Sequence, residues 1–183
     1  MQEKIVLGFT GLIASGKGTA AKYLKEKYGA TTYRFSSMLR DALDRFYLPQ
    51  TRENMVAISE CLRQTFGQDL MAKVIAEDVK KNQNRIIIVE GVRRLPDIKY
   101  LREVPGFKLI KIDASAETRY GRLIKRGENP DDKSKTYEQF LADHQLPTEL
   151  TVPEAMSQAD SAIDNDGSLE DLYSQLDKII KNS

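Results

Sequence analysis

The chain has little of what several common kinds of functional site require. Its 183 residues include one cysteine, one histidine and no tryptophan. The single cysteine, Cys61, excludes a disulfide within the chain, and the lack of a Cys/His cluster excludes a zinc site of the usual kind. His144 has no evident nucleophile or metal ligand beside it, so we expect a surface residue. We expect Cys61 to pack as a small apolar side chain in an amphipathic helix.

Two further absences concern the surroundings of the protein. Lys and Arg number 28 against 27 Asp and Glu, so the net charge of +1 provides no general field that would attract nucleic acid or an anionic membrane. The sequence contains no run on the order of 18 apolar residues and no signal-peptide core. We therefore expect a cytoplasmic protein, monomeric or homodimeric, whose partner is neither a membrane nor a nucleic acid.

Short β-branched runs alternate with amphipathic stretches along the chain. Strands are expected at residues 4–10, 31–35, 85–89, 107–112 and 161–163. Helices are expected at residues 16–28, 37–47, 52–66, 69–81, 95–103, 116–126 and 137–144, with a last one opened by Ser168. The alternation predicts one three-layer α/β domain over residues 1–183, with a mainly parallel five-stranded sheet flanked by helices. Ligands of such sheets bind beyond the carboxyl ends of the strands.

One motif stands at the carboxyl end of the first expected strand. Residues 11–19 read GLIASGKGT and satisfy G-x4-G-K between a strand and a helix. The glycines let backbone N–H groups face inward, and Lys17 reaches the β- and γ-phosphates of a triphosphate. Gly18 replaces the usual Ser or Thr, so Thr19 becomes the candidate hydroxyl near Mg²⁺. The expected ATP-binding residues of this loop are Gly11, Ala14, Ser15, Gly16, Lys17, Gly18 and Thr19.

Several separate segments resemble the nucleoside monophosphate kinase superfamily of P-loop kinases, which includes adenylate kinase, its archaeal relatives and dephospho-CoA kinase. GKGT at 16–19 looks like the adenylate kinase form of the loop, and SSMLR at 36–40 is similar to that family's acceptor segment. Glu90-Gly91-Val92-Arg93 stands where the superfamily has an acid, a glycine and an arginine, which favours an acceptor phosphate site over an AAA+ ATPase. ADSAIDNDGSLE at 159–170 resembles the C-terminal segment of dephospho-CoA kinases.

On the acceptor side, the resemblance implies a helical insertion at about residues 36–82. Ser37 and Arg40 would bind the acceptor, and either Arg93 or Arg94 would hold its phosphate. Glu90 would lie near Mg²⁺ or the acceptor.

On the donor side, the resemblance implies a lid at about residues 127–134, entered by a helix whose arginines lie one turn apart. Arg122 would lie near the donor base and Arg126 at the transferring phosphates. Asn165 and Gly167 would border the adenine.

These features predict a kinase that moves the γ-phosphoryl group of ATP, with Mg²⁺, to a nucleoside or deoxynucleoside monophosphate or a similar small phosphate-bearing acceptor. Phosphoryl transfer requires positioning and charge neutralisation, which arginine forks supply. Two alternatives stay open. One is a dephospho-CoA kinase-like hydroxyl kinase, although residues 35–37 lack that family's carboxylates, and the other is an ATP-binding regulatory or assembly factor. The expected catalytic residues are Lys17, Glu90, Arg122 and Arg126.

Overall fold

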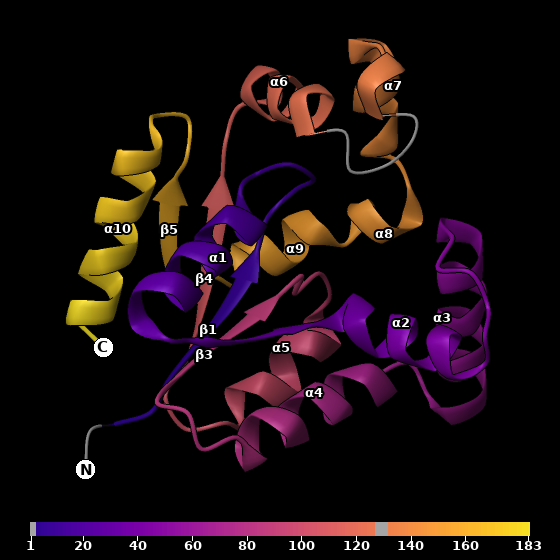
Figure 1. The fold of residues 1–183 in the computed structure, drawn as a ribbon, viewed down its shortest axis with the longest axis horizontal. Helices are drawn as coiled ribbons and strands as arrows, with labels where there is room; N and C mark the ends of the chain where they lie inside the picture. The colour runs from indigo at the N-terminus through magenta and orange to yellow at the C-terminus, as the bar shows by residue number, and fades with distance from the viewer. Residues whose placement is uncertain (1–2, 127–131) are drawn as a thin grey trace.

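The computed structural model describes residues 3–126 and 132–183. Its sheet contains the strands β1 (Ile5–Thr10), β2 (Thr31–Arg34), β3 (Ile86–Glu90), β4 (Phe107–Asp113) and β5 (Ser161–Asp164). The strands lie in the order β2-β3-β1-β4-β5, and all four neighbouring pairs are parallel. The predicted five-stranded α/β sheet is confirmed. The order places β1, which leads into the GLIASGKGT motif, at the centre of the sheet (Figure 1).

The helices connect and cover these strands. They are α1 (Lys17–Tyr28), α2 (Phe35–Arg45), α3 (Arg52–Phe66), α4 (Leu70–Lys81), α5 (Leu95–Arg102), α6 (Ala116–Arg126), α7 (Tyr137–Asp143), α8 (Pro147–Leu150), α9 (Val152–Ser157) and α10 (Leu169–Lys181), with a 3-10 turn, η1 (Asp132–Ser134). Sequence reasoning missed α8 and α9. Both are short and carry a proline in their first turn, where the missing N–H breaks no helical hydrogen bond.

The structure has three layers, because two hydrophobic clusters, one on each face of the sheet, pack helices against it. Successive residues of β1 alternate between them, with Leu7 packed in the cluster beneath α1 and α10 and Val6 in the cluster beneath α4, α5 and α9. Figure 1 shows α1 and α10 on one side of the sheet. The period of two follows from strand geometry, and burial on both faces explains why β1 and β3 are apolar up to their last residues, Thr10 and Glu90.

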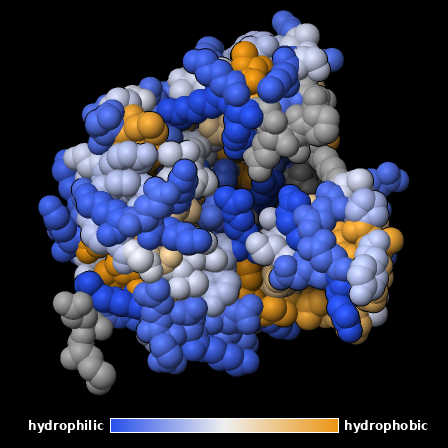
Figure 2. Space-filling view, in the orientation of Figure 1, coloured by the Kyte–Doolittle hydropathy of each residue, from blue (hydrophilic) through white to orange (hydrophobic). Residues whose placement is uncertain are grey.

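Two groups of helices flank the carboxyl ends of the strands. The α2–α3 arm lies on one side, and α6, η1 and α7 lie on the other (Figure 1). Figure 2 shows a recess between them, bordered largely by hydrophilic residues. Most of the expected lid, residues 127–131, falls outside the described residues.

Cys61 corrects one expectation, because it is exposed on α3 rather than packed. No helix among residues 3–126 and 132–183 is long and apolar enough to cross a membrane.

Candidate functional site

The loop between β1 and α1 has the backbone of a phosphate cradle. Gly11 and Gly16 have φ values of 148° and 105°, and Ala14 also adopts a positive φ of 60°. A Cβ at position 11 would lie 2.2 Å from the carbonyl oxygen of Ile112, and one at position 16 would lie 2.1 Å from Nδ2 of Asn165. Glycine is therefore required at both positions by conformation and by space.

Lys17 folds back into its own loop. Its Nζ donates hydrogen bonds to the carbonyl oxygens of Gly11 at 2.7 Å and Leu12 at 2.8 Å, and approaches Ser15 Oγ at 3.4 Å. Burial, followed by the positive charge of Arg93, lowers the pKa of Lys17 from 10.5 to about 7, although Glu149 and Glu90 act in the opposite direction. The amine is thus held inside the loop, close to other charged residues. An incoming anion would stabilise its protonated form.

Asn165 braces the loop from the neighbouring turn. Its side chain is buried, and Nδ2 donates to the carbonyl oxygen of Ser15 at 2.8 Å, while its backbone N–H donates to Asp113 at 2.8 Å. The resemblance implied a position beside the adenine; the contacts give Asn165 a support role in the loop itself. Gly167 lies in the same exposed turn, before Ser168, which caps α10 as expected.

Glu90 lies at the end of β3 and is buried, with 7% of its surface exposed. Its Oε2 accepts from Nη2 of Arg34 at 2.8 Å, because the parallel register sets Arg34 of β2 directly opposite Glu90. A Cβ at position 18 would lie 3.1 Å from this Nη2 and 3.7 Å from Glu90 Oε2. Gly18 therefore leaves room for an ion pair beside the first turn of α1. Sequence reasoning missed Arg34, although it ends a strand at the edge where ligands bind.

The structure separates the two arginines after β3. Arg93 pairs through Nη1 with Oε1 of Glu149, a buried residue of α8, and its charge reaches Lys17. Arg94 instead approaches Oε1 of Gln68, at 3.4 Å. Both backbone N–H groups donate to Oδ2 of Asp97, at 3.2 and 3.1 Å, which fixes the turn. No sequence signal identified Glu149, because its helix was not predicted.

The arginines of α6 lie at different places around the loop. Arg126 is exposed, and its charge acts on Lys17. Arg122 is half-buried, has an unpartnered Nη1 among the described groups, and acts on Asp166 in the turn that holds Asn165. This places Arg122 on the side of that turn and Arg126 on the side of Lys17.

Arg119, one turn before Arg122, was missed by the sequence analysis and is buried. Its Nη1 donates to the loop carbonyl of Ile13 at 3.3 Å and contacts His144 Nε2 at 2.8 Å. Because a guanidinium only donates, Nε2 accepts and Nδ1 donates to Leu141 at 3.1 Å. His144, whose ring also packs edge-on against Phe140, is therefore not the isolated surface residue that we expected.

Three of the expected site residues lie at the surface, and none of their observed contacts is with the charged residues around the loop. Arg40 is exposed on α2 and donates to Gln50 Oε1 at 2.8 Å. Ser37 is exposed one turn earlier on the same helix, and Thr19 is exposed in the first turn of α1.

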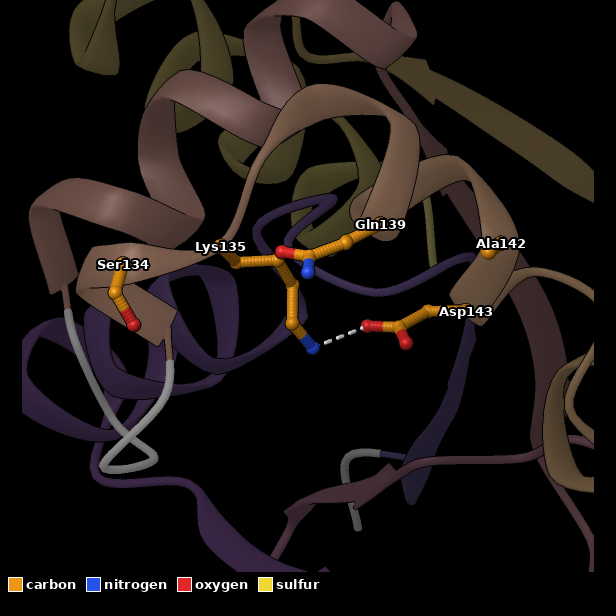
Figure 3. Close-up of a pocket in the computed structure, with 5 residues that line it drawn as sticks. All are labelled: Ser134, Lys135, Gln139, Ala142 and Asp143. Atoms are coloured by element: carbon orange, nitrogen blue, oxygen red, sulfur yellow. Dashed lines mark hydrogen bonds and ion pairs between the residues drawn. The ribbon is translucent and has the colours of Figure 1, made fainter.

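Two cavities lie beside these elements. One, of about 330 Å³, adjoins the loop and is lined by Leu12, Arg119, Leu141, His144, Gln145, Glu149, Leu150 and Pro153. The other, of about 450 Å³, lies at η1 and α7, where Lys135 points toward Asp143 and pairs with it at 2.6 Å (Figure 3). The residues that line this second cavity include none of the expected site residues.

Comparison with known proteins agrees with this geometry. Residues 10–139 match a family described as an AAA domain. The arginines that follow Glu90 favoured a kinase acceptor site over an AAA+ ATPase. The family match is compatible with either, since AAA ATPases and P-loop kinases share the P-loop. A UPF0200 protein from Methanoregula boonei is 33% identical over 176 residues, covering 96% of this chain and 95% of the relative. One from Methanocaldococcus jannaschii is 32% identical over 181 residues, covering 97% and 89%.

Solved structures with the same fold include kinases. A shikimate kinase from Bacteroides thetaiotaomicron aligns with a TM-score of 0.65 at 14% identity and covers 97% of each chain. A sugar kinase from Janibacter aligns with a TM-score of 0.59 at 18% identity, covering 98% of this chain and 95% of that one. At these identities the likeness shows the fold. The family match and the two relatives, 33% and 32% identical over most of each chain, establish that the chain belongs to the AAA-domain family and to the UPF0200 family, with the fold of P-loop kinases.

Proposed function

We propose that the protein transfers the γ-phosphoryl group of ATP to a small phosphate-bearing acceptor of the nucleoside monophosphate kind. The observation that carries the proposal is the gathering of Lys17, Arg93 and Arg126 at the loop, where the charges of both arginines act on Lys17. Cations at one place repel one another, and although Glu149 and Glu90 offset part of this repulsion at Lys17, a bound polyphosphate would neutralise more of it. Two substrates that each bring phosphate supply that negative charge.

The loop would bind the donor through its backbone. Gly11 to Thr19 would surround the β-phosphate, with the N–H groups of the first turn of α1 and Lys17 directed at it. Arg122, beside the Asn165–Gly167 turn, would lie toward the base, and Arg126 toward the phosphates. Arg93 takes precedence over Arg94 as the contact to the acceptor phosphate, since Arg94 is directed at Gln68.

Mg²⁺ fits this arrangement only as an ion held mainly by phosphate oxygens and water. No group of three or more His, Cys, Asp or Glu side chains suited to a metal occurs within residues 3–126 and 132–183. Mg²⁺ in kinases commonly keeps several waters and uses one carboxylate, for which Glu90 beside Gly18 is suited, with Thr19 as a nearby hydroxyl. Bound there, the ion would neutralise charge on the phosphates. In the structure this carboxylate pairs with Arg34 at 2.8 Å.

The helical region at 36–82 would bind the remainder of the acceptor, and the lid at 127–134 would exclude water that competes as acceptor. Ser37 and Arg40 would have to turn inward from the exposed positions that they occupy. We accordingly propose that the α2–α3 arm closes when the acceptor binds, bringing Arg40 to the phosphate.

The test is an ADP-release assay with Mg²⁺ and ATP against ribo- and deoxynucleoside monophosphates and dephospho-CoA. Lys17→Ala serves as the blank and Lys22→Ala, an exposed residue of the same helix, as the matched control. Turnover that requires one monophosphate and disappears only in Lys17→Ala supports the proposal. A requirement for dephospho-CoA would replace it with the hydroxyl kinase. ATP binding without turnover on any acceptor would favour a regulatory or assembly factor.

A further inference from the structure

Glu149 is a buried carboxylate at the loop whose hydrogen bonding is only half satisfied. It exposes 6% of its surface, and its Oε1 pairs with Nη1 of Arg93. Its Oε2 is buried and has no hydrogen-bond partner among the described groups. An unpartnered buried oxygen costs about 1–3 kcal/mol, so a residue serving stability alone is poorly arranged here.

The surroundings of Glu149 are those of an anion site. It lines the same cavity of about 330 Å³ as Leu12 of the loop and Arg119. Its charge raises the pKa values of both Lys17 and Arg119, in opposition to the burial that lowers them. A carboxylate therefore lies among three cations, Lys17, Arg93 and Arg119, at the place where the loop would meet phosphate.

Carboxylate and phosphate oxygens compete for the same arginine donors. Both accept the paired N–H groups of a guanidinium in similar geometry, and a phosphate dianion carries more charge. An arginine paired with a carboxylate in the empty protein is kept near its working position. It is released only when a stronger anion arrives and the carboxylate finds water or another donor.

We infer that Glu149 is a positioning residue that holds Arg93 in the empty site and yields it to a phosphate group bound beside Lys17. The inference rests on the proposed function, because it takes the loop to be a polyphosphate site. The carboxylate of Glu149 would limit the affinity of the loop for phosphate, because it competes for Arg93. Arg93 would therefore contact the substrate only when phosphate occupies the loop. Arg93 would then lie between the donor phosphates beside Lys17 and the acceptor phosphate assigned to it above, so that binding of the donor alone already draws it from Glu149.

The test compares the wild-type protein with Glu149→Gln, which keeps the shape and removes the charge. Tripolyphosphate and Mg²⁺-ATP are titrated by calorimetry at about pH 6 and again about one pH unit lower, because loss of Glu149 lowers the pKa of Lys17 below its value of about 7 and the lower pH keeps more of the amine protonated. We expect Glu149→Gln to bind both probes about tenfold more tightly, since the competing carboxylate is gone. Glu154→Gln, an exposed residue of α9, should leave both affinities unchanged.

Equal or weaker binding of the probes by Glu149→Gln would overturn the inference. A gain that came only from the loss of a negative charge near the anion would not depend on Arg93. Adding Arg93→Met to Glu149→Gln should abolish the gain, because Arg93 is what the change releases. If the gain persisted without Arg93, the inference would also fail.

Three further outcomes lead to different conclusions. If Glu149→Gln does not fold, Glu149→Asp, which stretches the pair by one methylene, should give a smaller gain in the same direction, and a loss would overturn the inference. If neither wild-type nor variant protein bound either probe, the proposed function and this inference would fall together. Binding by the wild-type protein without a gain in the variant would overturn the inference alone.

Discussion

Lys17 should make the empty protein less stable near neutral pH than it would be without the lysine. The pKa of Lys17 falls from 10.5 to about 7 on folding, because the amine is buried and Arg93 repels it. At or below pH 7 this corresponds to at most about 5 kcal/mol of lost unfolding free energy. Part is returned by the hydrogen bonds to Gly11 and Leu12, at about 1 kcal/mol each.

The sign follows from proton binding. Between pH 7 and 10.5 the unfolded chain keeps the Lys17 proton that the folded chain has lost, so stability rises with pH in this window. Below pH 7 both states are protonated and the cost is fully present. The slope contributed by Lys17 is at most about 1.4 kcal/mol per pH unit.

Lys17→Met removes the charge with little change in length. We expect the variant to be about 2–3 kcal/mol more stable than the wild-type protein at pH 7, with the advantage shrinking steadily toward pH 10. The assay is urea unfolding followed by circular dichroism across this range, with Lys22→Met of the same helix as the control. The difference between two proteins cancels every other titrating group that they share.

Parallel stability curves for the wild-type protein and Lys17→Met would refute the reasoning, because they would show that Lys17 titrates alike in both states. Lower stability of Lys17→Met at every pH would refute it too, by showing that the hydrogen bonds outweigh the buried charge.

Four further changes test the loop, its support by Asn165, a control glycine of α6, and the contact between Asp177 of α10 and Lys27 of α1. Gly16→Ala should abolish ATP binding in a fluorescence titration, since the added Cβ would lie 2.1 Å from Nδ2 of Asn165 and φ at this position is 105°. Gly121→Ala should instead stabilise the protein by about 0.5–1 kcal/mol in urea unfolding, because no atom lies within 4 Å of the added Cβ. Asn165→Ala should weaken ATP binding about tenfold by calorimetry, because Ser15 loses its brace. Burial alone would raise the pKa of Asp177, but hydrogen bonds led by the one from Lys27 lower this pKa to about 2. Asp177→Asn should therefore reduce the free energy of unfolding in urea by about 1 kcal/mol at pH 7. The difference should fade as pH falls from about 4 to 2, where the wild-type carboxylate becomes protonated.

Sequence reasoning predicted the elements that carry strong local signals. The β-branched runs became the five strands, with β1 beginning at Ile5 and β2 ending at Arg34, each within one residue of the expectation. The loop was predictable because its glycines, flanking strand and flanking helix coincide. The helices α8 and α9 were not predictable in this way, since they span only 4 and 6 residues and are too short to show a helical period.

The site was less predictable than the fold, because charge partners come from distant elements. Arg34 and Glu90 meet across 56 positions through strand register, and Arg93 and Glu149 meet across the same separation through a helix that was not expected. The position of Arg119, one turn before Arg122, was a usable signal, but its contacts with Phe140 of α7 and with His144 depend on tertiary packing. Whether Arg93 or Arg94 faces the loop depended on the turn that Asp97 fixes.

The central claim concerns where the γ-phosphoryl group goes, and the most direct measurement is to follow it. ATP radiolabelled at the γ-phosphate is incubated with the protein, Mg²⁺ and each nucleoside monophosphate, and the products are separated. The account predicts label in a nucleoside diphosphate made from one acceptor, little label in inorganic phosphate, and neither product with Lys17→Ala. Label found only in inorganic phosphate, or equal transfer by Lys17→Ala, would contradict it.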